Sequence, residues 1–422
     1  MIPQLKKLPN GLRLLLVSMK EQRTATVLVL VEAGSKYETK GENGISHFLE
    51  HMCFKGTTGR PSQLLISQEL EGLGMEYNAF TGMEYTGYYA KARADYLPRV
   101  VDLLADIYCN PLFRKEDIDQ EREAIKGEIA MYEDVPMRKV QHLFMKVLYG
   151  EQPAGREILG PKAHVEKFTR EDFLLYRKVH YVPAATVVVV AGKFDPAKTE
   201  KLIREKFDGF KRGKKKGKIP VDDRQRAPKV LVEFKKSDQT HLILGVRSYS
   251  LTHKYHHTAV VLAAILGSGI SSRLFQKVRT ELGLGYYVNA SHDAYTDHGL
   301  FAASAGVTNE RAQEAVVAIL CEFKRLKDEL VSSEELKKVK DMISGRLVLG
   351  LESSDELAEF YGFQEILKKK TVTPEGAIQK IASVTAKDVQ KVAMEIFVTG
   401  HLNLALIGPW KDERAFQKLL KF

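Results

Sequence analysis

The feature that most constrains the fold of this chain is an internal repeat that recurs towards the end of each half. The segment Thr169–Gly192 (TREDFLLYRKVHYVPAATVVVVAG) and the segment Thr385–Gly408 (TAKDVQKVAMEIFVTGHLNLALIG) follow one pattern. Each predicts a capped helix, a short loop, and an apolar strand that ends in Gly. Four positions match at a spacing of 216 residues: Thr169 with Thr385, Asp172 with Asp388, Tyr181 with Phe397, and Gly192 with Gly408. The repeat therefore predicts two related domains.

The length of the chain agrees with this division, because 422 residues are more than one hydrophobic core usually supports. Strand patterns at 230–234 and 241–247 and an apolar helical pattern at 259–266 open the second half, in the same order as the first half opens. Strands and helices that are grouped separately favour the α+β class, with two homologous domains of layered helices and sheet, over an alternating doubly wound sheet. The predicted domains are residues 1–210 and 229–422, joined by a linker at 211–228.

The predicted linker is strongly basic, and the whole chain carries a formal net charge of +10. Its run Lys211–Lys218 (KRGKKKGK) contains two Gly and is followed by Pro220, which is typical of an exposed connection. The charge favours acidic partners such as anionic lipids or acidic peptides, but it is also what solubilising surface lysines produce. A nucleic-acid interface would interleave basic and aromatic residues on a recognisable module, and none is present, so we expect no nucleic-acid partner.

The cysteines and the N-terminal segment indicate the cellular compartment. The three cysteines Cys53, Cys109 and Cys321 form no CxxC pair, and their odd number argues against a disulfide framework. The N-terminal segment runs into the turn signal Pro9-Asn10-Gly11 without the apolar core of a signal peptide. No apolar run approaches the eighteen or so residues that a membrane span needs. We expect a cytoplasmic protein without a membrane partner.

The motif that carries chemistry is His47-Phe48-Leu49-Glu50-His51, in a predicted helix at 47–55 with Ser46 as its N-cap. His47 and His51 are four residues apart and share a helix face, so both imidazoles can reach one metal ion. Zinc suits such a site because it accepts imidazole nitrogen and carboxylate oxygen, and Glu50 lies one turn from His47 as a candidate general base. The alternative is an ordinary helix with two unrelated histidines.

A third ligand is expected from the acidic helix at 115–133. Glu121 and Glu128 lie two turns apart on one face of it, together with apolar residues, and buried carboxylates need a compensating cation. The alternative is a solvated acidic face. In the second half, Val339 and Arg346 occupy the matching positions, and no HxxEH motif occurs there. One repeat therefore carries the predicted metal set, and the other does not.

The segment Gly44–Thr57 (GISHFLEHMCFKGT) resembles the inverted zinc-peptidase family that includes pitrilysin, insulin-degrading enzyme and the mitochondrial processing peptidase. The resemblance covers nearly the whole chain, through Glu32-Ala33-Gly34-Ser35 in the first half and Ser271-Ser272-Arg273-Leu274-Phe275 in the second. It implies the duplicated fold of the mitochondrial processing peptidase, in the short form that makes one half of a clamshell. The segment Gly150–Gly160 departs from the family, which often has His-Pro near this point.

The resemblance also implies roles for the candidate residues. His47, His51 and Glu128 are implied as the ligands of one zinc ion per chain. Glu50 is implied as the general base, and Glu121 as the carboxylate that orients a ligand histidine.

Further residues are implied to contact the substrate. The resemblance makes the segment Asn78, Ala79, Phe80 and Thr81 an edge strand that pairs with the peptide backbone. It makes Arg279 and Tyr286 of the second half hydrogen-bond donors to the substrate and the oxyanion. The alternative for this last pair is a surface arginine and a packed tyrosine.

The function that follows from the resemblance is a zinc-dependent endopeptidase for unfolded peptides, with a closed chamber formed by two chains. A homodimer suffices because one chain holds both the metal set and the Arg279–Tyr286 pair, and a heterodimer with a sister subunit is the other form. The alternative function is a catalytically silent or scaffold subunit of a heteromeric processing complex.

Overall fold

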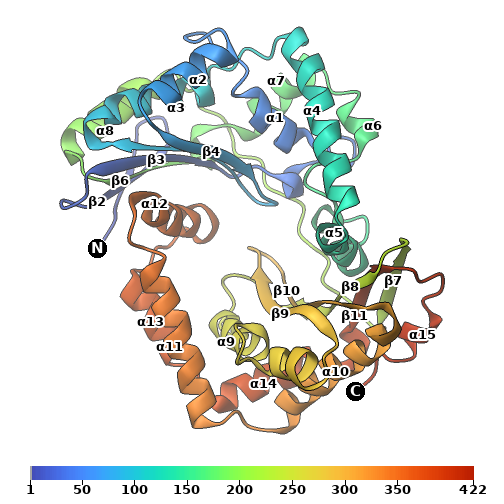
Figure 1. Cartoon of the computed structure of the whole chain (residues 1–422). Helices are drawn as coiled ribbons and strands as arrows, with labels where there is room; N and C mark the ends of the chain where they lie inside the picture. The colour runs from blue at the N-terminus through green and yellow to red at the C-terminus, as the bar shows by residue number, and fades with distance from the viewer. Residues whose placement is uncertain (1) are drawn as a thin grey trace. The chain divides into compact units, whose positions relative to one another are not determined.

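The computed structural model describes residues 2–422, and they form two compact units. The first unit contains the chain up to Ile129, with Glu157–Ile219 and Val348–Thr373. The second contains Ala130–Arg156, Pro220–Leu347 and Pro374–Phe422. Each unit has one β-sheet with helices on it, which confirms the α+β class (Figure 1).

The sheet of the first unit has six strands in the order β1-β2-β6-β3-β5-β4. The central strands β3 and β6 are runs of valine, leucine and other apolar or β-branched residues. Such runs favour strands that are covered on both faces, and nearly every residue of these two strands is buried. β2 and β6 are parallel, and the other neighbours are antiparallel. The strands span Gln4–Lys7 (β1), Arg13–Ser18 (β2), Thr24–Val31 (β3), Glu76–Thr81 (β4), Thr86–Arg93 (β5) and Thr186–Gly192 (β6).

The sheet of the second unit repeats this topology in the order β7-β11-β8-β10-β9. β11 lies between a parallel β7 and an antiparallel β8, as β6 lies between β2 and β3. The strands span Lys229–Phe234 (β7), Gln239–Ser248 (β8), Gly285–Ala294 (β9), Gly299–Thr308 (β10) and Asn403–Gly408 (β11). The predicted repeat helices, α7 (Arg170–His180) and α14 (Ala386–Ile396), both begin at a capping box, made by Thr169 with Asp172 and by Thr385 with Asp388. The internal repeat is thus confirmed.

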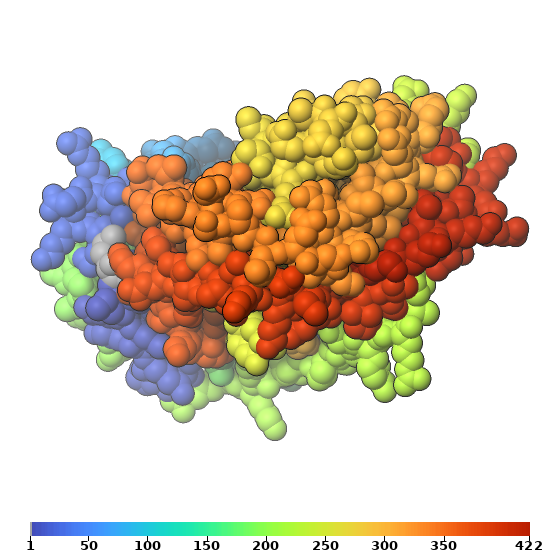
Figure 2. Space-filling view, turned by 90° about the horizontal axis from the view of Figure 1, so that it is seen from below, coloured from blue at the N-terminus to red at the C-terminus, as the bar shows by residue number. Residues whose placement is uncertain are grey.

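Helices cover both faces of each sheet (Figure 1). In the first unit, α3 (Leu97–Cys109) packs on β3 and β5, and α12 (Ser354–Phe363) packs on β3 and β6. In the second unit, α9 (His256–Gly267), α10 (Ala312–Asp328) and α14 share one core with the sheet, and α5 (Pro136–Tyr149) forms a separate core with β8 and β11. Figure 2 shows the later part of the chain, coloured from orange to red, at the surface.

The chain has further α-helices in both units. They are α1 (Ile45–Met52), α2 (Gln63–Gly72), α4 (Lys115–Asp134), α6 (Lys162–Val165), α8 (Pro196–Lys206), α11 (Ser333–Leu349), α13 (Pro374–Ala382) and α15 (Arg414–Gln417). Within residues 2–422, no helix combines the length and apolar character that crossing a membrane requires.

The two units exchange a helix, so they differ from the predicted contiguous domains 1–210 and 229–422. α5 comes from the first half of the sequence, but its Phe144 and Leu148 pack on the second sheet. α12 comes from the second half, but its Leu357 and Tyr361 pack on the first sheet. Helical periodicity reveals an apolar face and does not reveal which sheet covers that face. The prediction therefore assigned each helix to the domain of its neighbours in the chain.

The predicted linker has no helix or strand between residues 211 and 226, but it is attached to both units. Up to Ile219 it belongs to the first unit, where Lys215 forms an ion pair with buried Glu32 and Lys218 with buried Glu84. From Pro220 it belongs to the second unit. Two lysines of the basic run therefore neutralise buried carboxylates of the first unit, so the run is not only an exposed connection.

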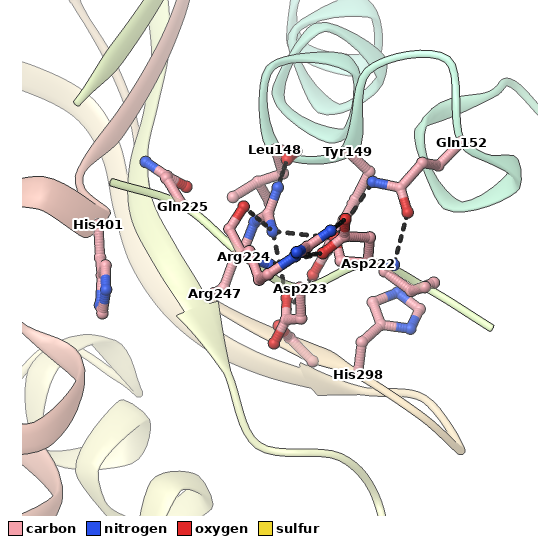
Figure 3. A network of polar contacts seen from close by, with 12 residues as sticks. Leu148, Tyr149, Gln152, Asp222, Asp223, Arg224, Gln225, Arg247, His298 and His401 are labelled. Carbon is pink, nitrogen blue, oxygen red and sulfur yellow. Dashed lines mark hydrogen bonds and ion pairs between the residues drawn. The ribbon is translucent and has the colours of Figure 1, made fainter. Parts of the chain in front are cut away.

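In the second unit, the buried guanidinium of Arg247 on β8 fixes both the linker and α5 (Figure 3). It donates hydrogen bonds to the carbonyl oxygens of Asp222 and Arg224, each at 3.1 Å, and to that of Leu148 at the end of α5. The side chain of Gln152 closes the same network by bonding the backbone of Asp222. The exchanged helix is thus held by polar contacts as well as by its core.

Candidate metal centre

Helix α1 places His47, Glu50 and His51 on one short element. The helix begins at Gly44, whose φ of 103° is left-handed, and not at the predicted N-cap Ser46. The missing side-chain cap is replaced by Glu38, whose carboxylate accepts the N–H groups of Gly44 and Ser46 at 2.9 Å. The predicted cap was wrong because the capping group comes from outside the helix.

Helix α4 brings the third ligand to α1. One ligand atom from each of His47, His51 and Glu128 lies within 4.8 Å of the others. Glu128 Oε2 is 3.5 Å from His47 Nε2 and 3.7 Å from His51 Nε2. Two imidazole nitrogens and one carboxylate oxygen form the ligand set that zinc accepts in catalytic sites with an open fourth position. The residues present therefore fit a zinc ion.

The electrostatic surroundings agree with this fit. Burial, together with the neighbouring His51, lowers the pKa of His47 to about 3, so its imidazole is neutral and has a lone pair to offer. His47 Nδ1 is buried and has no hydrogen-bond partner among residues 2–422, and its Nε2 faces Glu128. A metal ligand must be deprotonated, and His47 meets this condition across the physiological pH range.

Glu121, two turns before Glu128 on the same face of α4, orients the second histidine. His51 Nδ1 lies 2.8 Å from Glu121 Oε1, and Lys55 forms an ion pair with the other carboxylate oxygen. Burial alone would raise the pKa of Glu121, but the hydrogen bonds from His51 and Lys55 lower it. An ionised Glu121 that accepts the Nδ1–H leaves Nε2 of His51 as the free lone pair.

Glu50 is separate from the ligand set and has the properties of a general base. Its residue is only 8% exposed, and burial raises the pKa of its carboxyl group. The hydroxyl of Thr81, at the end of β4, donates a hydrogen bond to Glu50 Oε2. A carboxyl group with a raised pKa takes and releases a proton near neutral pH more readily than an ordinary glutamate.

Strand β4 is the outermost strand of its sheet and pairs only with β5 among the described residues. Asn78 and Ala79 line a pocket of about 280 Å³ together with Glu50 and His51. Sequence reasoning missed its remaining lining residues, which are Phe54, Lys55, Gln63 and Tyr77 beside Glu121. Phe54 and Lys55 lie about one turn beyond the HxxEH motif and Tyr77 directly precedes Asn78, which was the available signal; Gln63, the first residue of α2, had none.

The four predicted strand residues do not all reach the pocket. Thr81 contacts Glu50, as described above, whereas the ring of Phe80 packs against Tyr85 and Phe363. We infer that Phe80 holds the strand in place rather than facing a ligand.

Arg279 and Tyr286 lie in the second unit. Arg279 is in a π-helical segment (Phe275–Glu281), with its guanidinium 5.0 Å from the centre of the Phe275 ring. Tyr286, on β9, is 60% exposed, so it is not the packed tyrosine of the alternative interpretation. Their role towards a substrate stays a prediction.

The second repeat has no equivalent metal set among residues 2–422. His47, His51 and Glu128 are the one group of three or more candidate ligands found in this part of the chain. Helix α9, which follows β8 as α1 follows β3, buries an almost wholly apolar sequence. This agrees with a duplication in which one copy holds the metal and the other is structural.

Each half of the chain matches a family model of peptidase family M16. Residues 13–162 match the family model described as Insulinase (Peptidase family M16), and residues 167–343 match the one described as Peptidase M16 inactive domain. An uncharacterized zinc protease of Streptomyces coelicolor is 34% identical over 97% of this chain and 90% of its own length. One of Bacillus subtilis is 32% identical over 95% of this chain and 97% of its own length.

Solved structures share the fold at lower sequence identity. A protease from Helicobacter pylori superposes with a TM-score of 0.90 at 22% identity, over 97% of this chain and 99% of that one. A peptidase M16 inactive domain from Pseudomonas fluorescens gives a TM-score of 0.90 at 17% identity, over the same shares of the two chains.

Proposed function

Because the chain belongs to the insulinase family, peptidase family M16, we propose that it hydrolyses peptide bonds as a zinc-dependent endopeptidase. The single observation that carries the proposal is the convergence of His47, His51 and Glu128 beside the buried Glu50. Relatives that are named zinc proteases and span nearly the same length support it.

His47, His51 and Glu128 would hold one zinc ion per chain. Zinc bound there supplies a Lewis acid that polarises the scissile carbonyl and makes a water molecule more acidic. Glu121 keeps His51 in the tautomer that a ligand needs.

Glu50 carries the proton in this proposal. Its carboxylate takes a proton from the attacking water and delivers it to the nitrogen of the leaving amine, which balances the hydrolysis. Thr81 holds one carboxylate oxygen by its hydroxyl hydrogen bond, so the other oxygen is the one that faces the reacting water. Burial, which raises the pKa of Glu50, makes its carboxylate a stronger base towards the attacking water.

The substrate is an extended, unfolded peptide that adds to the free edge of β4 by backbone hydrogen bonds. Asn78 and Ala79 line the pocket beside Glu50, so a peptide on this edge would pass the general base. Arg279 and Tyr286 would donate hydrogen bonds to the substrate and to the developing oxyanion. Two chains, in a homodimer or with a sister subunit, would together enclose the peptide.

The test is cleavage of a pool of quenched fluorescent peptides by the purified chain, by Glu50→Gln, and by the chain treated with a chelator. We expect cleavage by the wild type alone, and zinc at one ion per chain in both the wild type and Glu50→Gln. Zinc at that ratio without any cleavage by the wild type would instead support the scaffold function or the need for a sister subunit.

A further inference from the structure

The start of helix α1 depends on a side chain from outside the helix. The N-cap Gly44 offers no side chain, and the first N–H groups of a helix need acceptors. Both oxygens of the Glu38 carboxylate are used: Oε2 accepts from the N–H of Gly44, Oε1 from the N–H of Ser46, and Oε2 also from the Asn43 amide at 3.0 Å. Glu38 is only 1% exposed, so water cannot replace these bonds.

The segment that carries Glu38 is also attached to the turn after β4. The N–H of Ser35 donates to the carbonyl oxygen of Gly82 at 3.3 Å, and the N–H of Lys36 donates to that of Met83 at 2.9 Å. The buried ammonium of Lys36 donates to Glu84 Oε1 at 2.8 Å. The short 3-10 turn Ser35–Tyr37 is therefore fixed to the β4–β5 turn before the chain reaches Glu38.

Helix α1 and strand β4 are consequently joined at two places. Thr81 and Glu50 join them at the pocket, and the segment from Ser35 to Glu38 joins the β4–β5 turn to the beginning of α1. Between these two joints lie the candidate metal ligand His47 and the edge that is proposed to hold the peptide. The relative position of the helix and the strand matters because reactions are sensitive to displacements of about 1 Å in a site.

Resting on the peptidase function proposed above, we propose that Glu38 is a positioning residue for the reaction. Its carboxylate holds the first turn of α1 against the β4–β5 turn and so sets where His47, Glu50 and His51 stand relative to the edge of β4. It acts through the backbone of Gly44 and Ser46, whose N–H groups donate to its two carboxylate oxygens.

The variant Glu38→Gln tests this with little change of volume. A glutamine has one acceptor oxygen, so its NH2 group would face either the N–H of Ser46 or both the N–H of Gly44 and the Asn43 amide, and at least one donor would lose its acceptor. The matched control is Glu356→Gln. Glu356 lies in the same unit and caps α12 by accepting the N–H and the hydroxyl of Ser353 at 3.1 and 2.9 Å, away from the metal ligands.

The first readout uses cobalt(II) chloride alone as the probe, since the visible absorption of bound cobalt reports the arrangement of its ligands. We expect Glu38→Gln to change the band shape and to lower cobalt and zinc affinity by about 10- to 100-fold, the range for lost ligand support. The control Glu356→Gln should keep the wild-type spectrum and affinity. A wild-type spectrum and affinity in folded Glu38→Gln would overturn the proposal.

The second readout is peptide cleavage at saturating zinc. We expect kcat of Glu38→Gln to fall, because Glu50 on α1 is displaced relative to the bound peptide. KM should change little, because the edge of β4 that binds the peptide stays in place. Equal kcat in Glu38→Gln and Glu356→Gln would count against positioning. If the wild type cleaves no peptide, the proposed function fails, but the cobalt spectra still decide the role of Glu38.

A second variant keeps the test decisive if Glu38→Gln does not fold. Asn43→Ala removes one donor to Glu38 and leaves its carboxylate and both helix N–H groups. We expect a smaller change in the same direction, both in the cobalt spectrum and in kcat. Wild-type values for folded Asn43→Ala would then overturn the proposal.

Discussion

Glu121 Oε1 lies 2.8 Å from Nδ1 of His51, so a carboxylate on α4 determines which nitrogen of a histidine on α1 is free. The contact joins two residues that are 70 positions apart in the sequence and lie on different helices. It also separates the tasks of the two carboxylates on α4, because Glu128 faces Nε2 and Glu121 faces Nδ1.

Glu121→Gln should weaken metal binding without removing a ligand. The amide is a poorer acceptor than a carboxylate and leaves Lys55 without its ion pair, so His51 is held less firmly. We expect zinc affinity to fall about 10- to 100-fold in a competition titration with a chromogenic chelator. Glu123→Gln, at an exposed position on the same helix, is the control and should bind zinc as the wild type does.

Thr81→Val should lower catalysis and spare the metal. The substitution keeps the shape of the side chain in β4 and removes the hydroxyl that donates to Glu50. We expect kcat/KM for a fluorescent peptide to fall at least several-fold, while zinc content measured by mass spectrometry of the metal stays at the wild-type level. Unchanged kcat/KM would show that Glu50 does not need this hydrogen bond.

Asp223→Asn should stabilise the protein at neutral pH and not in acid. Burial raises the pKa of Asp223 to about 6, against the lowering effect of Arg247. A carboxyl group whose pKa is raised by folding makes its full contribution to stability only below its unfolded pKa, and that contribution is lost as the pH rises through about 6. The side chain is 43% exposed, so we expect a modest effect.

The measurement is the melting temperature of Asp223→Asn and the wild type between pH 4 and pH 8. The variant should match the wild type at the acidic end and melt higher above pH 6. A difference that is constant across this range would contradict the raised pKa.

Phe144→Ala should destabilise the second unit, although residue 144 lies in the first half of the sequence. Phe144 is 2% exposed and packs in the core that α5 forms with β8 and β11. Removing a buried phenylalanine leaves a cavity and costs about 3 to 5 kcal/mol. Hydrogen exchange should show the loss of protection in β8 and β11 before β3 and β6. The control Met137→Ala, at a half-exposed position on the same helix, should change little.

The sequence was sufficient to predict the residues that share one element or one repeat. The HxxEH spacing predicted two imidazoles on one helix face. The repeat that begins at Thr169 and at Thr385 predicted two equivalent helix–strand units. Both predictions were possible because these patterns are local. The choice between Glu121 and Glu128 needed the resemblance to a family, since helical spacing alone gives both the same face.

Other features depend on contacts between distant segments, which local patterns do not contain. Glu38 has no mark in the sequence that links it to α1, and Ser46 is a better local cap candidate than Gly44. Two further contacts between distant segments also leave no local mark in the sequence: the hydrogen bond from Thr81 to Glu50, and the ion pair of Lys215 with Glu32. The exchange of α5 and α12 is the largest such difference.

The helix exchange has a consequence for the order in which the protein can be completed during synthesis. All six strands of the first sheet have been made once the ribosome passes Gly192, but the helix that covers β3 and β6 on one face is residues 354–363. A nascent first half therefore presents an apolar sheet surface for the time needed to make about 170 further residues, at roughly 5 to 20 residues per second. The first unit becomes complete only when most of the second has already been made. A fragment that ends before α12 contains every candidate metal ligand but lacks the helix that completes its core.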